Sequence, residues 1–245
     1  MPVRRIGTWK DSLRRLADAF VASMLPGGWE LFSILARVDG YLYPHEAVFL
    51  YWLARQGPGA GDMAEIGSFR GRSTLCMAAG LRHRGHDTIL AIDPHVYRTE
   101  AELRENIEHF EASRYVEPVA APSAAAAVAC RRPLRLIFID GNHEKENVEA
   151  DVRAWLPHLV PGGLLLLHDS TDLSLFAGPR EVAANLRGDS SRFSSTGTIG
   201  SIHWFRLAGS SDSWKPAEYG KSWIDLILEV VTRRKNRVRS RTESL

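Results

Sequence analysis

The sequence predicts an α/β fold in which helices cover both faces of a mostly parallel sheet. Short apolar runs alternate with helically spaced segments, most clearly at 134–139, 148–159 and 163–167. A strand–helix–strand unit with a right-handed crossover has parallel strands. Both strands then end at the same edge of the sheet, where open α/β sheets bind their ligands.

The remaining elements follow from the same patterns. Residues up to about 55 have helical spacing that is broken at Asp39-Gly40, and Pro44 begins a second helix. Three further short strands precede the central pair, and two segments around Gly197 and Gly200 form an antiparallel hairpin near the end. These expected strands cover residues 63–66, 88–92, 115–119, 193–196 and 201–207.

Composition narrows the class of protein. The chain has 245 residues, 44% of them hydrophobic, and a formal net charge of +2. Six basic residues and one acidic residue lie in the tail 232–245, so the rest holds 25 basic and 28 acidic residues, a net charge of −3. This mildly acidic body argues against nucleic-acid binding. The tail is either disordered or contacts an anionic surface.

The sequence indicates the cellular compartment and the state of the cysteines less strongly than it indicates the fold. Cys76 and Cys130 lie among small and apolar residues without metal-site spacing, so we expect buried free thiols. No apolar run approaches the roughly 20 residues of a membrane span. Leu13, Leu16, Phe20 and Met24 share one face of an expected amphipathic helix rather than a cleaved signal. We expect a cytoplasmic protein with no transmembrane segment.

A glycine turn follows the first strand. Residues 67–74 carry Gly67 and Gly71, and a helical segment comes next, so backbone N–H groups can face a ligand. Asp93 ends the second strand 22 positions after Gly71, where a carboxylate can bind both ribose hydroxyls. The spacing is G-x-x-x-G rather than G-x-G-x-x-G, which argues against a dinucleotide.

Polar side chains follow the two central strands directly. Asp140 and His143 come after the first strand, and His168 and Asp169 come after the second. Parallel strands bring all four to one edge. Paired carboxylates at strand ends repel each other unless a cation or substrate lies between them. His143 could instead cap a loop, His168 could orient Asp169, and Asp93 could cap its turn.

Together these motifs resemble class I S-adenosylmethionine (SAM)-dependent methyltransferases. The likeness is greatest to the family with macrolide-sugar O-methyltransferases and cephalosporin-hydroxylase-like proteins, and it covers about residues 41–207. The matching segments are 65–73, 91–94, 139–143, Asp151 and 161–169. The resemblance implies a Rossmann-like, seven-stranded, mostly parallel sheet with an antiparallel C-terminal hairpin.

The resemblance also implies site roles. Glu65, Gly67 and Ser73 would line the methionine end of SAM, Asp93 would hold the ribose and Ser123 would lie near the adenine. The full set expected to bind SAM is Glu65, Gly67, Ser68, Gly71, Ser73, Asp93, Ser123 and Asp140. Asp140, His168 and Asp169 would bind a divalent cation, Mg²⁺ or Mn²⁺, and His143 would be the base. His168 departs from the acidic residue common at its position, which favours a softer ion.

We therefore expect an O-methyltransferase, assisted by a cation, that acts on a hydroxyl of a sugar or other small natural product. Its acceptor would be a small molecule, such as a glycoside. Other readings are a hydroxylase-like or hydrolytic metal enzyme, or a SAM-binding protein without turnover, and more weakly a nicotinamide enzyme. Terminal helices could support a homo-oligomer.

The expected domain organisation has four parts. A helical cap or lid covers residues 1–58, and the methyltransferase domain covers 59–209. A linker and helix at 210–231 and the basic tail at 232–245 follow. The Trp- and Tyr-rich segment 29–45 would either cover the site or pack against the sheet.

Overall fold

The computed structural model describes residues 28–85, 87–172 and 174–209. The expected amphipathic helix at 13–24, the C-terminal helix at 223–231 and the basic tail lie outside the described residues. The domain division at 58/59 and the parts expected beyond residue 209 stay predictions.

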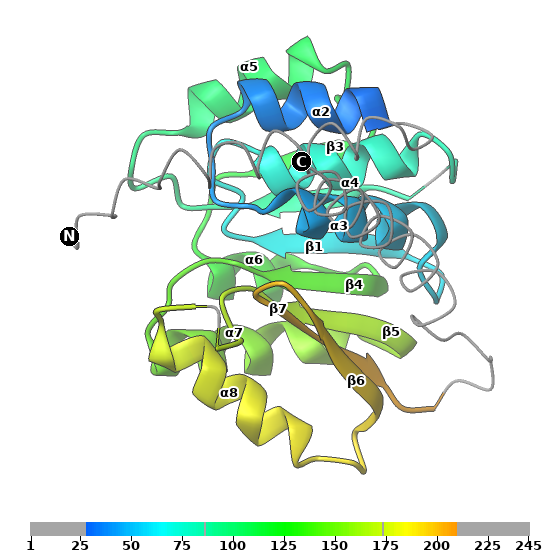
Figure 1. The fold of residues 1–245 in the computed structure, drawn as a ribbon, viewed down its shortest axis with the longest axis vertical. Coiled ribbons are helices and arrows are strands. Elements are labelled where there is room, and N and C mark those ends of the chain that lie inside the picture. The colour runs from blue at the N-terminus through cyan, green and yellow to red at the C-terminus, as the bar shows by residue number, and fades with distance from the viewer. Residues whose placement is uncertain (1–27, 86, 173, 210–245) are drawn as a thin grey trace, which may run out of the picture. The chain divides into compact units, whose positions relative to one another are not determined.

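The centre of the fold is a seven-stranded sheet with the order β3-β2-β1-β4-β5-β7-β6. Figure 1 shows this order from β3 near the top to β6 near the bottom. The first five strands along the chain pair in parallel, whereas β7 pairs antiparallel to both β5 and β6. The predicted mostly parallel sheet with a reversed C-terminal hairpin is thus confirmed. The strands are β1 Asp62–Ile66, β2 Ile89–Ile92, β3 Val116–Val119, β4 Leu134–Ile139, β5 Leu159–Leu167, β6 Phe193–Ile199 and β7 Ile202–Leu207.

Helices connect the parallel strands, and two more precede the sheet. α3 begins at Pro44, whose fixed φ suits the first turn of a helix, and it packs closely on α4. Gly80 permits this approach, because a Cβ there would lie 2.3 Å from the Tyr51 carbonyl oxygen. The helices are α2 Gly28–Arg37, α3 Pro44–Gln56, α4 Arg72–Leu81, α5 Glu100–His109, α6 Ser123–Ala129, α7 Lys145–Trp155, the 3₁₀ turn η1 Leu156–His158 and α8 Ala177–Arg187.

The core forms where helices cover the sheet. Val148, Val152 and Trp155 of α7 are buried in one cluster with strand residues such as Ile137 and Leu165. Their spacing of three to four residues places them on one face of the helix. Burying each such side chain contributes roughly 1.5–3 kcal/mol, so α7 is held to the sheet mainly by apolar packing.

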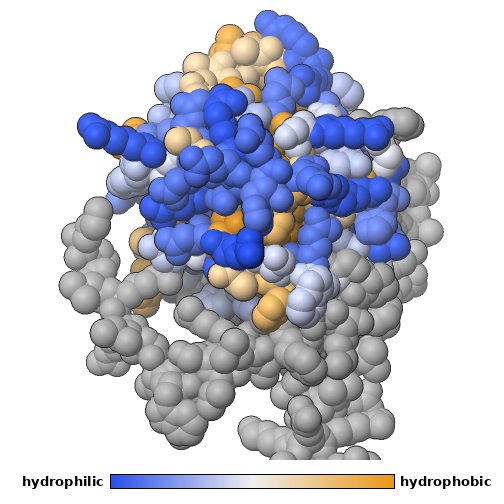
Figure 2. Space-filling model, turned by 90° about the horizontal axis from the view of Figure 1, so that it is seen from above, coloured by the Kyte–Doolittle hydropathy of each residue, from blue (hydrophilic) through white to orange (hydrophobic). Residues whose placement is uncertain are grey.

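The surface around α5 is polar. Glu102, Glu105 and Glu108 of this helix are exposed, and the face seen from above in Figure 2 is mainly hydrophilic. Within the described ranges, no helix has the length and apolar character needed to cross a membrane. Cys76 and Cys130 are free and buried, as predicted.

Candidate functional site

The glycine turn joins the ends of three strands. Gly67 has a φ of 94° and donates its N–H to Ile92 O at 2.8 Å. A Cβ at Gly67 would lie 2.3 Å from the Asp140 carbonyl oxygen, so only glycine allows β1 and β4 to end this close together. Gly71, with a φ of 89°, precedes the first residue of α4. The predicted turn and helix start are therefore present.

Glu65 anchors α4 to the sheet. Its side chain is fully buried and accepts hydrogen bonds from the hydroxyls of Ser73 and Thr74. Burial raises the pKa of Glu65 to about 7, the two hydroxyl donors oppose this, and the negative charges of Asp140 and Asp93 add to it. The carboxyl group thus fixes the first turn of α4 beside the glycine turn.

Asp93 closes the same turn from the end of β2. Its Oδ2 accepts the Phe69 N–H at 2.8 Å, and its Oδ1 accepts the His95 N–H at 2.6 Å. Each carboxylate oxygen can accept further hydrogen bonds. Asp93 therefore organises the loop and still offers acceptors for the two hydroxyls of a ribose.

Two buried polar atoms beside Asp93 lack partners. Ser68 Oγ and His95 Nε2 have no hydrogen-bond partner among the described residues, although His95 Nδ1 lies 2.9 Å from Thr99 Oγ1. Buried polar atoms are nearly always paired, so unpaired ones suggest a ligand. His95 also has a left-handed backbone, with a φ of 50°. The residues around Asp93 thus offer polar atoms that a polar ligand can pair with.

Ser123 is already engaged with the protein. It begins α6, and its hydroxyl donates to Asp151 Oδ1 at 2.5 Å and accepts the Trp155 Nε1–H at 2.9 Å. Burial raises the pKa of Asp151, and the Ser123 bond opposes the shift. The structure thus gives Ser123 and Asp151 a local role in holding α6 to α7.

Asp140, His143 and Asp169 lie together after β4 and β5. One potential ligand atom from each lies within 4.8 Å of the other two. His143 Nε2 lies 3.1 Å from Asp169 Oδ2, and this bond lowers the pKa of Asp169 although burial opposes it. Asp169 has a φ of 51°, a strained conformation for a residue other than glycine. Two carboxylates and an imidazole form a donor set suited to Mn²⁺ or Mg²⁺.

His168 is arranged differently from the expected cation ligand. Its Nδ1 lies 2.9 Å from Asp140 Oδ1 and its Nε2 lies 3.3 Å from Glu46 Oε2, so both nitrogens already face carboxylates. Burial lowers the pKa of His168, but the attraction of Asp140 and Glu46 prevails and raises it well above 6.5. An imidazole with both nitrogens engaged has no lone pair for a metal. The geometry gives His143 the third ligand position instead.

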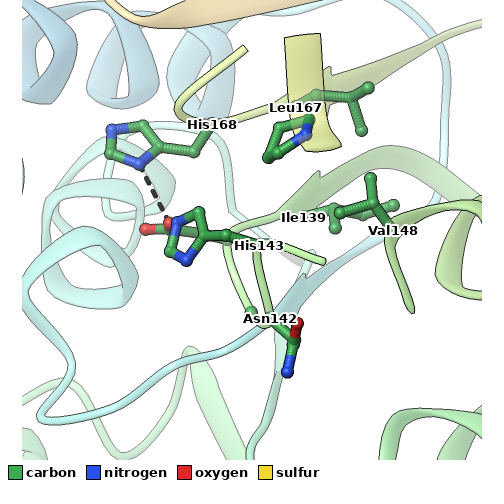
Figure 3. Close-up of a pocket in the computed structure, with 9 residues that line it drawn as sticks. Ile139, Asn142, His143, Val148, Leu167 and His168 are labelled. Atoms are coloured by element: carbon green, nitrogen blue, oxygen red, sulfur yellow. Dashed lines mark hydrogen bonds and ion pairs between the residues drawn. The ribbon is translucent and has the colours of Figure 1, made fainter. Parts of the chain in front are cut away.

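A small hollow opens beside these residues. The hollow is bordered by Ile139, Asn142, His143, Val148, Leu167 and His168, which Figure 3 labels. The dashed line in Figure 3 marks the bond from His168 to the Asp140 carboxylate. Apolar strand ends form one part and polar loop residues form the other. With a volume of about 10 Å³, the hollow has room for about one water molecule.

Two residues near His143 and His168 had no role predicted from the sequence. Phe176, which is 41% exposed, stacks on the His143 ring with centroids 3.9 Å apart and an interplanar angle of 17°. Glu46 is fully buried in the first turn of α3. Its position two residues after Pro44 is typical of a helix-capping acid, and no local pattern linked it to His168.

Comparison with known proteins agrees with the fold. Residues 64–170 match a family described as a methyltransferase domain. The fold resembles an O-methyltransferase from Bacillus cereus in complex with SAH: 22% identity, TM-score 0.60, covering 80% of this chain and 99% of that one. It also resembles the O-methyltransferase TomG from Streptomyces achromogenes, involved in tomaymycin synthesis, in complex with SAM: 16% identity, TM-score 0.56, covering 85% and 100%. The O-methyltransferase NovP is 14% identical with a TM-score of 0.59, covering 68% and 81%.

Proposed function

We propose that this chain is a class I SAM-dependent methyltransferase that transfers the methyl group to a hydroxyl of a small molecule. The match of residues 64–170 to a methyltransferase domain supports this proposal. The observation that carries the proposal is the His143–Asp169 pair, with 3.1 Å between Nε2 and Oδ2. This pair lies beside Asp140, whose backbone packs against Gly67 of the glycine turn. A base and a methyl donor would therefore meet at one edge of the sheet.

The residues of the glycine turn support SAM as the donor. Asp93 offers its carboxylate oxygens to the ribose hydroxyls, and Ser68 and His95 offer their unpaired polar atoms. The N-terminus of α4, fixed by the bonds from Ser73 and Thr74 to Glu65, supplies free N–H groups. We propose that Gly67 and Gly71 let SAM approach the backbone and that Ser123 borders the adenine.

His143 would activate the acceptor. An aliphatic hydroxyl is a weak nucleophile, and a neutral imidazole within hydrogen-bond reach can accept its proton during attack. The Asp169 carboxylate orients the ring and stabilises the imidazolium that results, as a carboxylate does in other His-based sites. Since the sulfonium methyl of SAM is already activated, the remaining task of the site is to align the hydroxyl oxygen, methyl carbon and sulfur.

A divalent cation fits the donor set of Asp140, His143 and Asp169. When bound, such an ion lowers the pKa of a hydroxyl that it contacts. A neutral imidazole has one free lone pair, which cannot both bind a cation and accept a proton, so two modes of activation are distinguishable. His143 is the base without the ion and a ligand with it.

The acceptor would carry a ring. Phe176 presents a half-exposed aromatic face directly beside His143, and such faces stack on aromatic rings or on the apolar faces of sugars. We propose a hydroxylated cyclic natural product, such as a glycoside, as the acceptor class.

Transfer of labelled methyl from SAM to a panel of hydroxylated aromatic compounds and glycosides tests the proposal. We expect label on an acceptor oxygen, with turnover compared after chelation and after Mg²⁺ or Mn²⁺ is added back. Full activity with chelator would assign His143 as the base without a cation. SAM binding without transfer to any acceptor in the panel would contradict the proposed function.

A further inference from the structure

We propose that Glu46 is a positioning residue of the reaction site, acting through His168 on the carboxylate of Asp140. The inference rests on the proposed function, because it assigns Asp140 to the site where the acceptor is activated. Glu46 belongs to α3 and lies outside the matched methyltransferase segment, residues 64–170.

The carboxylate of Glu46 is fixed in place by both oxygens. Oε1 accepts the Ser201 backbone N–H at 2.6 Å and the Ser201 hydroxyl at 2.8 Å. Oε2 accepts the Tyr43 N–H at 2.9 Å and lies 3.3 Å from His168 Nε2. The side chain is fully buried. Glu46 therefore joins the start of α3, the β6–β7 turn and the end of β5 through one group, and its two oxygens have separate tasks.

The His168 ring passes this constraint to Asp140. The ring is buried and packs edge-on against Phe138, with centroids 5.8 Å apart and an interplanar angle of 80°. Its Nδ1 lies 2.9 Å from Asp140 Oδ1. A ring held by Glu46 at one nitrogen and by an aromatic edge has one orientation, which fixes one Asp140 oxygen. The other oxygen of Asp140 is then available to the group formed with His143 and Asp169.

The two oxygens of Glu46 have different partners. A substitution can therefore separate the positioning of His168 from simple anchoring of the β6–β7 turn. In Glu46→Gln, an amide oxygen at Oε1 can keep both Ser201 bonds, while the NH₂ group replaces the acceptor that faces both His168 Nε2 and the Tyr43 N–H. Ser201→Ala is the matched control, since it removes one bond to Oε1 and leaves the His168 contact. Ser201 lies in the turn and is not part of the proposed reaction site.

The experiment compares full-length wild type, Glu46→Gln, Ser201→Ala, His168→Asn and the double variant Glu46→Gln/His168→Asn. Partners that orient metal ligands from the outer shell typically contribute about 10- to 100-fold to affinity or activity. We expect Glu46→Gln to lower kcat and to weaken Mn²⁺ binding, measured by paramagnetic resonance, each about 10-fold, with KM for SAM within about twofold. Ser201→Ala should leave all three near wild type.

Two readouts do not depend on turnover. In metal-free protein labelled with ¹⁵N-histidine, the His168 ring signals, identified by their loss in His168→Asn, should shift in Glu46→Gln and stay in place in Ser201→Ala. The double variant should bind Mn²⁺ no more weakly than His168→Asn alone, because Glu46 acts through that ring. These results support positioning even if the acceptor panel yields no transfer, so failure of the proposed function is distinguishable.

Other results would overturn the inference. Unchanged His168 ring signals in Glu46→Gln would show that the two groups are not linked. Equal losses in Glu46→Gln and Ser201→Ala, matched by equal falls in melting temperature, would reduce Glu46 to an anchor of the turn. Additive losses in the double variant would also contradict action through His168.

Discussion

The polar and charged side chains at the two ends of β4 differ in how completely they are paired within the protein. Arg135, near the start of the strand, is buried, and its guanidinium is paired with groups of the protein itself. Its Nε donates to Asp87 at 2.6 Å, and its terminal nitrogens donate to the Leu53 and Ala54 carbonyls at 3.0 and 2.7 Å. The amino end of the sheet is thus closed by a charge whose partners come from α3 and the loop before β2.

At the carboxyl end, polar groups are gathered but incompletely satisfied. Ser68 Oγ and His95 Nε2 are buried without partners among the described residues. Phe69, His95 and Asp169 have left-handed backbones, which cost of order 1–3 kcal/mol each. Paired polar groups at one end stabilise the fold, and unpaired or strained groups at the other end are available to ligands. Substitutions at the amino end should therefore lower stability, whereas substitutions at the carboxyl end should lower activity.

The largest effect is expected from His143→Ala. Loss of the proposed base or ligand should lower methyl transfer by about 10²- to 10⁴-fold, while SAM affinity by calorimetry and melting temperature change little. The matched control is His109→Ala, an exposed histidine of α5 that contacts Arg37. A His143→Ala variant with activity like that of His109→Ala would refute the assignment of the reaction site.

Arg135→Met should produce the reverse pattern. The substitution keeps an apolar side chain but removes the guanidinium donor to Asp87 and to the Leu53 and Ala54 carbonyls, and a hydrogen bond to a charged group contributes about 1.5–3 kcal/mol. Urea unfolding should report this loss, and kcat per folded molecule should stay near wild type. An active-site defect without lost stability would contradict the division between the two ends.

Much of the fold and part of the candidate site could be predicted from the sequence. Apolar runs identified all seven strands, and parallel crossovers implied that Asp140, His143 and Asp169 would meet. The orientation of His168 could not be read, because adjacent side chains alternate along a strand, and local pattern does not tell which of His168 and Asp169 turns inward. Glu46 lies 122 positions before His168, and only packing of α3 against the hairpin brings them together.

Glu65 makes the stability of the fold depend on pH. Unlike Arg135, this buried carboxyl has hydroxyl partners rather than an oppositely charged one. Its pKa rises from 4.5 to about 7, so between these values the folded state binds more protons than the unfolded state. Stability from this group is present below pH 4.5 and falls as pH rises to about 7, by roughly 3 kcal/mol.

Glu65→Gln removes this dependence. We expect the stability of Glu65→Gln relative to wild type, from urea unfolding, to increase between pH 4.5 and pH 8. Asp62→Asn, at the partly exposed start of β1, is the control for general effects of removing a carboxylate from this strand. A constant difference between Glu65→Gln and wild type across the range would mean that Glu65 is ionised throughout.

The smallest expected effect concerns Phe176, whose ring stacks on His143. Aromatic stacking contributes about 0.5–1.5 kcal/mol beyond area burial, so Phe176→Leu should raise KM for a ring-bearing acceptor by about two- to tenfold. The KM for SAM should not move, since Phe176 lies on the His143 side rather than beside Asp93. Phe176→Tyr keeps the ring face and should restore acceptor KM. If Phe176→Leu lowered kcat alone, the ring would serve to hold His143 rather than to bind the acceptor, because only binding lost equally from ground and transition states appears purely in KM.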